Sequence, residues 1–450
     1  MDSARTIIRS FQAAAMLLAA LLVASCGDDK EFGIRDEEEG ISYSYPGNRL
    51  QYKETRRVLL FYECGFNSLY SYLSDNMDED LVKGYLPGKG RNEDVVLVYS
   101  KIARNSNYAD VPSYLRRLYA DKDGSIVSDT LMTYSSSTVA TSPGTMTDVL
   151  NYVKTTFPAK GYGMVFSSHG SGWLPAGYYN NPSSFERSHQ AGGLKAARAL
   201  RLYGVPEGNM ETDDPYAGFV RSLGQDRMSG GDVEMSVPEF VSGFPFHLDY
   251  LLFDMCFGGG MEVVYALKDV ADYIGVSPAE VLAAGMYDYT TLTSYLLKSS
   301  TPDLAGLFKA SFDRYDSMSG DYRSATVTLV RSDGIDRLAE VCKGLFAKYS
   351  DAIANAPVSR IQGYFRLNRH YFYDLEDTFA KCGASDADLA TLKSAIDGSI
   401  VYKNATPSFI GAFDIKTYSG YSIYLPCAGT ALLDSYYKDE PWNRVVELVK

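Results

Sequence analysis

The chain has 450 residues, of which 46% are hydrophobic, and its formal net charge at pH 7 is −13. This length suffices for one large domain with appendages and a sizeable core. The acidic balance argues against nucleic acid as a partner and is compatible with basic peptides. After the N-terminal segment, no apolar stretch is long enough to span a membrane.

The first 25 residues have the pattern of a secretion signal. Arg5 and Arg9 precede an apolar stretch, residues 11–24, that is too short for an ordinary spanning helix. Small residues then lead directly into Cys26, which resembles a bacterial lipobox and predicts lipidation of Cys26. Acyl chains contribute about 0.8 kcal/mol per buried CH2, so the partner predicted for this end is a membrane. The alternative is a plain signal peptide with a chance cysteine.

Residues 26–52 are polar and acidic, which predicts a flexible tether. An acidic stretch after a lipidated cysteine also resembles the surface-export signal of some Bacteroidetes lipoproteins, although a solvated linker has the same composition. We therefore expect a lipid-anchored protein of the cell envelope, at the outer membrane or surface of a Gram-negative bacterium.

From residue 55 onward, short apolar runs alternate with amphipathic stretches. Strands are predicted at 57–63, 94–100, 272–276 and 326–330, and in two further runs that end at His169 and Asp254. Helices are predicted at 66–83, 145–157, 261–268 and 304–315, a loop and then a helix at 108–118, and a hairpin at 125–134. This alternation indicates an α/β fold with a mostly parallel sheet covered on both faces.

The last third of the chain is predicted to be mainly helical. Helices are expected at 335–349, 386–396 and 443–448, with one strand at 421–425. We interpret residues 333–450 as a smaller C-terminal subdomain that returns this strand to the core.

Two of the predicted strands end in residues that carry chemistry. One run ends in His169 and Gly170, and another ends in Asp254, followed by Cys256 and three glycines. Parallel strands present their carboxyl ends at one edge, where α/β proteins place their sites. A thiol near a helix start favours the thiolate, and an imidazole on the same edge can transfer its protons. The alternatives are a buried structural cysteine and a turn histidine bonded to backbone.

Three separated segments carry a family resemblance. Residues 167–173 read Ser-Ser-His-Gly-Ser-Gly-Trp, residues 253–260 read Phe-Asp-Met-Cys-Phe-Gly-Gly-Gly, and residues 418–426 read Tyr-Ser-Gly-Tyr-Ser-Ile-Tyr-Leu-Pro. In this order they resemble the clostripain family of cysteine peptidases, in the clan of caspases, legumain and gingipains. The resemblance implies a caspase-like three-layer αβα catalytic domain, which we assign to residues 53–332.

The resemblance also implies an endopeptidase mechanism. Cys256 is expected to attack the scissile carbonyl, and His169 to donate a proton to the leaving amine and later help to activate water. Backbone N–H groups of Gly170 and Cys256 are expected to form the oxyanion hole. By the same resemblance no third catalytic residue is required, and the expected partners are protein or peptide substrates.

Asp254 matches the acid that family members place at the base of the P1 pocket, which predicts cleavage after Arg or Lys. Family members often supply a second acid, but this chain has Ala284 at that place, and Asp288 is displaced from it. Some family members depend on calcium. The sequence has no acidic loop of EF-hand type, so we expect no cofactor and no metal.

A long polar insertion, residues 175–235, separates His169 from Cys256. Long connections in compact domains are usually functional or disordered. Clostripain-like enzymes are cut in this region, so we predict self-cleavage after a basic residue, although a solvated loop is the simpler interpretation. The candidates are Arg187, Lys195, Arg198, Arg201, Arg221 and Arg227.

Six cysteines are present, and lipidation and catalysis would use two of them. The spacing of the other four does not say whether they pair, and buried free thiols are the simpler interpretation. They are Cys64, Cys342, Cys382 and Cys427. The competing functional hypothesis is a catalytically inactive binding lipoprotein on a peptidase-like scaffold, which the missing second acid would fit.

Overall fold

A computed structural model describes residues 55–89, 94–179, 182–183, 185–186, 223–228, 231–365 and 371–450. The predicted signal peptide, the predicted tether, Cys26 and most of the insertion lie outside these residues. Within them, no helix combines the length and the apolar character that crossing a bilayer requires.

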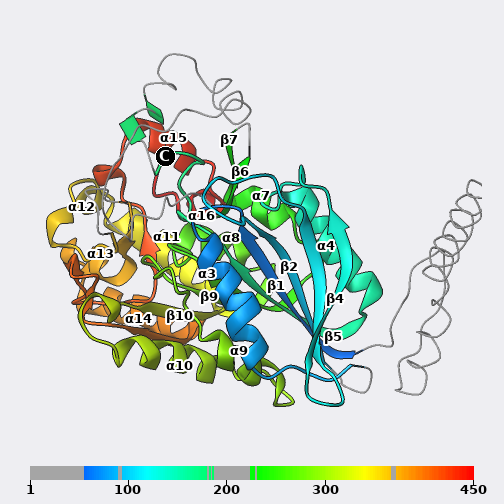
Figure 1. Ribbon diagram of the computed structural model, residues 1–450. Coiled ribbons are helices and arrows are strands. Elements are labelled where there is room, and N and C mark those ends of the chain that lie inside the picture. Colours follow the sequence, from blue (N-terminus) through cyan, green and yellow to red (C-terminus); the bar gives the residue numbers. More distant parts are fainter. Residues whose placement is uncertain are drawn as a thin grey trace, which may run out of the picture.

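A nine-stranded sheet forms the centre of the molecule (Figure 1), in the order β12-β10-β9-β8-β5-β1-β2-β3-β4. Its strands are β1 (Thr55–Gly65), β2 (Asp94–Ile102), β3 (Ser113–Ala120), β4 (Ile126–Tyr134), β5 (Ala159–Ser167), β8 (Leu248–Asp254), β9 (Ala271–Val276), β10 (Thr326–Arg331) and β12 (Ile400–Ala405). The five central strands, β9-β8-β5-β1-β2, are parallel. Antiparallel pairs occur only toward the two edges of this sheet.

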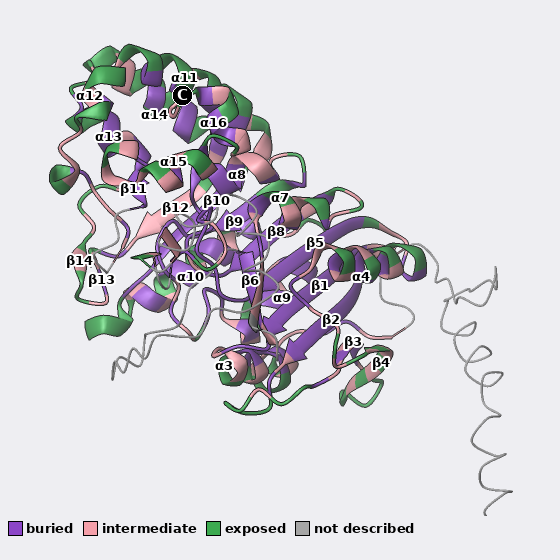
Figure 2. Ribbon diagram, turned by 90° about the horizontal axis from the view of Figure 1, so that it is seen from above, coloured by how far each residue is buried: buried purple, intermediate pink, exposed green. Residues whose placement is uncertain are grey.

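Helices cover both faces of the sheet, which confirms the predicted three-layer αβα fold. One face packs against α4 (Pro143–Thr156), α7 (Val237–Ser242), α8 (Met261–Leu267), α11 (Ile335–Lys348), α14 (Asp386–Ser399) and α16 (Pro441–Val446). The other packs against α9 (Tyr289–Leu297), α10 (Leu304–Asp316) and the segment formed by α3 (Tyr70–Ser74), η1 (Asp75–Asp80) and η2 (Leu81–Lys83). Figure 2 shows the buried sheet between helices whose outer surfaces are exposed. The central strands are continuously apolar because both of their faces are covered.

The remaining elements are short. The two-stranded pairs are β6 (Leu223–Met228) with β7 (Gly231–Met235), β11 (Tyr373–Asp374) with β15 (Ser422–Ile423), and β13 (Ser408–Phe409) with β14 (Phe413–Asp414). The short helices are α12 (Ser350–Ala354), α13 (Leu375–Lys381), α15 (Ala431–Tyr437), η3 (Gly320–Tyr322), η4 (Ser332–Gly334), η5 (Val358–Arg360) and η6 (Pro426–Ala428).

The loop predicted at the start of residues 108–118 is present, but the prediction of a helix after it is wrong. This region forms strand β3, which pairs with β2 on one side and with β4 on the other. Leu115 and Leu118 are three residues apart, a spacing that also fits one face of a helix. Hydrogen bonding to a strand on each side determines that this segment is a strand, and this long-range pairing cannot be read from the local sequence pattern.

The C-terminal third packs into the same core as the sheet. Trp173 packs against Tyr424 in a tilted arrangement and against Tyr437 edge to face, with ring centroids 4.8 and 4.9 Å apart. Buried Glu262 of α8 accepts hydrogen bonds from Tyr424 N, at 3.0 Å, and from the Tyr437 hydroxyl, at 2.7 Å. Residues 421–425 are all buried, but their strand β15 pairs with β11 and the sheet strand from this region is β12. The boundary at residues 332/333 stays a prediction.

Candidate active site

The loops that carry His169 and Cys256 touch at the carboxyl edge of two adjacent parallel strands. Strands β5 and β8 pair up to Ser167 and Asp254, and the two loops begin directly after these residues. A Cβ atom built on Gly170 would lie only 2.6 Å from the carbonyl oxygen of Cys256. A side chain at residue 170 would therefore force the loops apart, so glycine is required for this close approach.

His169 is almost completely buried and its ring contacts a serine. Its Nε2 atom lies 2.8 Å from Oγ of Ser68, and 3% of the residue is exposed. The preceding Ser168 bonds through its hydroxyl to the Cys64 carbonyl at 2.8 Å. The sequence analysis did not identify Ser68. The signal that could have found it is its position just after a strand that ends at the same edge.

Strand β6, in the C-terminal part of the insertion, packs against the histidine loop. The amide of Gly224 donates to the His169 carbonyl at 2.9 Å, and the amide of Gln225 donates to Ser168 Oγ at 3.1 Å. Gly170 also forms an isolated antiparallel bridge with Leu223. Strand β6 therefore holds the backbone on both sides of His169.

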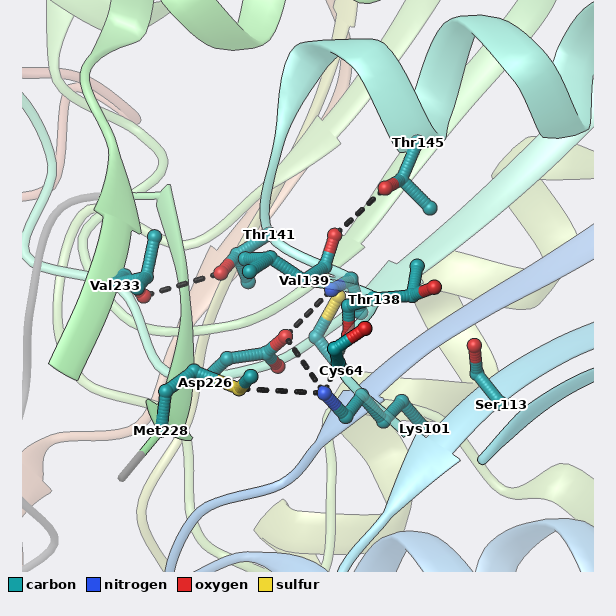
Figure 3. Close-up of polar contacts among 12 residues, drawn as sticks. Cys64, Lys101, Ser113, Thr138, Val139, Thr141, Thr145, Asp226, Met228 and Val233 are labelled. Carbon is teal, nitrogen blue, oxygen red and sulfur yellow. Dashed lines mark hydrogen bonds and ion pairs between the residues drawn. The ribbon is translucent and has the colours of Figure 1, made fainter. Parts of the chain in front are cut away.

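A buried polar cluster anchors the β6–β7 hairpin to the sheet (Figure 3). The ammonium group of Lys101 on β2 lies 3.9 Å from Oδ2 of Asp226 on β6, and both side chains are fully buried. The same carboxylate accepts a hydrogen bond from the amide of Ala140, and Lys101 also donates to the Thr138 carbonyl. Thr141 binds the second strand of the hairpin, β7, by donating to the Val233 carbonyl at 3.0 Å. Burial raises the pKa of Asp226 to about 6, although Lys101 opposes the shift.

Cys256 is partly buried, and its thiol contacts the segment that follows β9. Its sulfur accepts a hydrogen bond from the amide of Val281 at 3.2 Å. Helix α8 begins only at Met261, so four residues separate the thiol from the helix that the sequence placed beside it. The next residue, Phe257, has φ +57° and stacks on Phe372 at 4.3 Å. Backbone amides and packing thus fix the cysteine loop.

Asp254 is buried beneath this loop and is held by two donors. The amide of Met286 donates to Oδ1 at 2.6 Å, and the hydroxyl of Tyr289 donates to Oδ2 at 2.8 Å. Burial raises the pKa of Asp254, although these hydrogen bonds and the charge of Arg314 oppose the shift. A Cβ atom at Gly285 would lie 2.6 Å from Oδ2, so only glycine fits beside the carboxylate at this position.

Two other acids near Asp254 have different surroundings. Asp288 caps α9, since its carboxylate accepts from the Thr290 amide at 3.0 Å. Glu63, at the carboxyl end of β1, is fully buried beside Ser167 and was missed by the sequence analysis. The available signal was an apolar strand that ends in an acid, as the strand before Asp254 does.

Other predicted residues are placed as follows. Cys64, Cys342 and Cys382 are buried free thiols, as predicted, whereas Cys427 is free but exposed. Within the part of the chain that the structure describes, no group of three or more His, Cys, Asp and Glu side chains is arranged to hold a metal ion. Of the candidate cleavage residues only Arg227 lies in the described part, inside β6 with its amide bonded to the Phe66 carbonyl.

This fold, with a cysteine loop and a histidine loop in contact at one sheet edge, is that of a caspase-like cysteine peptidase. The clostripain family model matches residues 61–185 and 207–437, so the chain belongs to the clostripain family. It is a cysteine endopeptidase, and its substrates are proteins or peptides.

Solved structures of C11 proteases agree with this assignment. An inactive zymogen C11 protease from Parabacteroides distasonis is 26% identical with a TM-score of 0.66, over 88% of this chain and 99% of that one. A secreted C11 cysteine protease from Bacteroides thetaiotaomicron, solved with an irreversible peptide inhibitor, is 22% identical with a TM-score of 0.65, over 87% and 99%. The latter likeness concerns the fold alone. None of the curated proteins matches the chain.

Proposed function

We propose that Cys256 and His169 form the catalytic dyad of this endopeptidase. The sulfur of Cys256 attacks the scissile carbonyl and forms a thioester, while His169 gives a proton to the departing amine. Water, deprotonated with the help of His169, then hydrolyses the thioester and releases the acid product. The contact between Gly170 and the Cys256 carbonyl carries this proposal, because it brings both loops to one place.

The amides of Gly170 and Cys256 are proposed to bind the oxyanion that develops during attack. One such donor contributes about 10²–10³ to the rate when it is aimed at the developing charge. The close approach of the two loops supports the assignment. Substitution at residue 170 is expected to damage both the loop contact and this donor.

Asp254 is proposed to select Arg or Lys at P1. It is a buried carboxylate two residues before the proposed nucleophile, and only glycine at residue 285 fits beside its Oδ2 atom. A buried carboxylate binds a guanidinium or ammonium group through charge-assisted hydrogen bonds. No observation favours the alternative of an inactive binding lipoprotein.

The test is cleavage of fluorogenic peptides that end in Arg, Lys, Asp or Ala, by wild type and Cys256→Ala. We expect turnover after Arg and Lys that is lost in the variant. Cysteine-dependent turnover after another residue would keep the dyad and overturn the role of Asp254. No cysteine-dependent turnover of any peptide would overturn the dyad and favour the binding lipoprotein.

We also propose that the enzyme activates itself by cutting its insertion. The remaining candidates, in a segment rich in basic residues between the two loops, are Arg187, Lys195, Arg198, Arg201 and Arg221. Arg227 is set aside because its backbone is paired inside β6, and proteolysis favours exposed, unpaired chain.

Lipidation of Cys26 is proposed to hold the enzyme at the cell envelope. The support is the basic and apolar N-terminal segment that ends in small residues before this cysteine. The secreted relative from Bacteroides thetaiotaomicron is compatible with an extracellular location. We expect Cys26→Ser to move the enzyme from the membrane fraction to the soluble fraction, and continued membrane association of this variant would contradict the anchor.

A further inference from the structure

Two buried carboxyl groups lie at the carboxyl edge of the sheet, and the proposed specificity site uses only one of them. Glu63 pairs in register with Ser167, and Ser167 pairs with Asp254, so the three residues are aligned across strands β1, β5 and β8. Their exposed fractions are 0, 0 and 6%. The sheet therefore places Glu63 and Asp254 on the same face with one residue between them.

A chain of hydroxyl groups connects the two carboxyls. Oγ of Ser167 lies 3.1 Å from Oε1 of Glu63 and 3.1 Å from the hydroxyl oxygen of Tyr289. The Tyr289 hydroxyl lies 2.8 Å from Oδ2 of Asp254. Three consecutive hydrogen-bond contacts thus run from Glu63 to Asp254.

The number of available protons limits the total charge of this series of hydrogen-bonded groups. Each of the three contacts needs one proton, but Ser167 and Tyr289 supply only two. If both carboxyls were ionised, one contact would join two oxygens without a hydrogen. If one carboxyl keeps its proton, all three contacts are hydrogen bonds that point the same way. A buried polar group without a partner is costly, so the geometry favours one shared proton.

Glu63 is the more suitable holder of that proton. Burial and the charge of Asp254 raise the pKa of Glu63 well above its usual value, opposed by the Ser167 hydrogen bond. Asp254 has the additional amide of Met286, which stabilises a charged carboxylate. Among the described residues, no donor reaches Oε2 of Glu63. The chain then runs from a neutral Glu63 through Ser167 and Tyr289 to a charged Asp254.

We propose that Glu63 is the second acid of the P1 specificity site, coupled to Asp254 through Ser167 and Tyr289 by one shared proton. This rests on the proposed role of Asp254 in P1 recognition. Glu63 supplies the second acid that is absent at Ala284, and it does so from strand β1, which β5 separates from β8, instead of from the following loop. The site carries one negative charge while the proton is shared and two after it is lost, so its attraction for a basic P1 side chain increases with pH.

The other titratable groups around Glu63 keep their charge state while this proton is lost. Burial raises the pKa of Tyr289 and Tyr287 well above the usual tyrosine value. Arg314 on α10 donates to the Tyr287 carbonyl at 2.9 Å. Burial likewise raises the pKa of the adjacent Cys64 well above its usual value, with Asp226 contributing and Lys101 opposing.

The decisive measurement is the ratio of kcat/KM for an Arg peptide to that for the matching citrulline peptide, followed against pH. Citrulline has nearly the shape of Arg without its charge, so the ratio cancels the ionisation of the dyad. In wild type we expect the ratio to rise roughly tenfold as the shared proton is lost, mainly through a lower KM for Arg. In Glu63→Gln, which keeps a donor toward Ser167 but cannot ionise, the ratio should stay flat.

Glu262→Gln is the matched control, because Glu262 is also fully buried with one oxygen unpaired, and it lies outside the chain of hydroxyls. Its profile should follow wild type. A flat ratio in wild type, or an unchanged rise in Glu63→Gln, would overturn the inference while leaving the peptidase and Asp254 in place.

A second variant keeps the test available if Glu63→Gln does not fold. Ser167→Ala keeps both acids but breaks their connection, so the rise should occur at a different pH, and an unchanged midpoint would overturn the shared proton. Absence of any Cys256-dependent cleavage is a separate result, because it overturns the proposed function first.

Discussion

At the scale of single residues, Ser68 is a polar contact of the proposed general acid, His169. Its hydroxyl lies 2.8 Å from Nε2 of His169, in a buried environment. A hydrogen bond at Nε2 restricts rotation of the imidazole ring and so helps to set its orientation. Ser68 therefore acts on the chemistry through His169, as a positioning residue.

We expect Ser68→Ala to lower kcat about tenfold with little change in KM, because ring orientation matters in the transition state more than in substrate binding. Steady-state kinetics with an Arg peptide would measure both constants. Ser71→Ala, on an exposed residue of α3, is the control and should resemble wild type. An increase in KM at constant kcat would instead assign Ser68 to substrate binding.

At the scale of elements, the β6–β7 hairpin is the part of the insertion that contacts the histidine loop. Its hold on the sheet depends on buried Asp226 and Lys101, and its hold on the loop depends on the amides of Gly224 and Gln225. The hairpin therefore keeps His169 in place independently of the chain that precedes Leu223. This is the element through which the insertion can affect the site.

Asp226→Ala should destabilise the folded protein by about 3 kcal/mol, because it leaves Lys101 buried without its charge partner. The value is at the lower end for a broken buried pair, since Lys101 keeps the carbonyls of Ser136 and Thr138. Denaturant unfolding in a Cys256→Ala background would measure it. Asp313→Ala removes the exposed pair with Lys309 and should be indistinguishable from the background. Equal effects of the two substitutions would contradict the anchoring role.

At the scale of the whole molecule, a cut in the insertion would divide the sheet between two chains. The first would carry β1–β5 and His169, and the second would carry β8–β12 and Cys256. The parallel pairing of β5 with β8 and one continuous core would still hold the halves together. Cleavage therefore frees the insertion without separating the residues of the proposed dyad.

We expect wild type to give two bands on a denaturing gel and one species by size-exclusion chromatography, whereas Cys256→Ala stays a single chain. The physical reason is that the inter-strand hydrogen bonds and the buried apolar surface remain after one peptide bond is cut, so they keep the two fragments associated. Two bands in purified Cys256→Ala would show that another protease makes the cut. Separation of the halves on the column would contradict the shared sheet.

The sequence by itself determined the layer architecture and the position of the two reactive loops. Continuous apolar runs that alternate with amphipathic stretches predict a parallel sheet covered on both faces, because a strand that is apolar at every position must be buried on both of its faces. His169 and Cys256 end such runs, and the general rule for α/β sheets then places them on one edge. The apolar strand that ends at Asp254 also followed from the local pattern, whereas the spacing of the four other cysteines did not say whether they pair.

Only the tertiary structure decided which distant residues complete the site. Strand β3 could not be predicted, because its identity comes from pairing with two neighbours and its local spacing also fits a helix. Ser68 and Glu63 lie about a hundred or more positions before their partners His169 and Asp254. Strand order and register align Glu63 with Asp254 across Ser167, and hydrogen-bond geometry decides how the two carboxyls share charge. Neither feature can be read from a one-dimensional pattern.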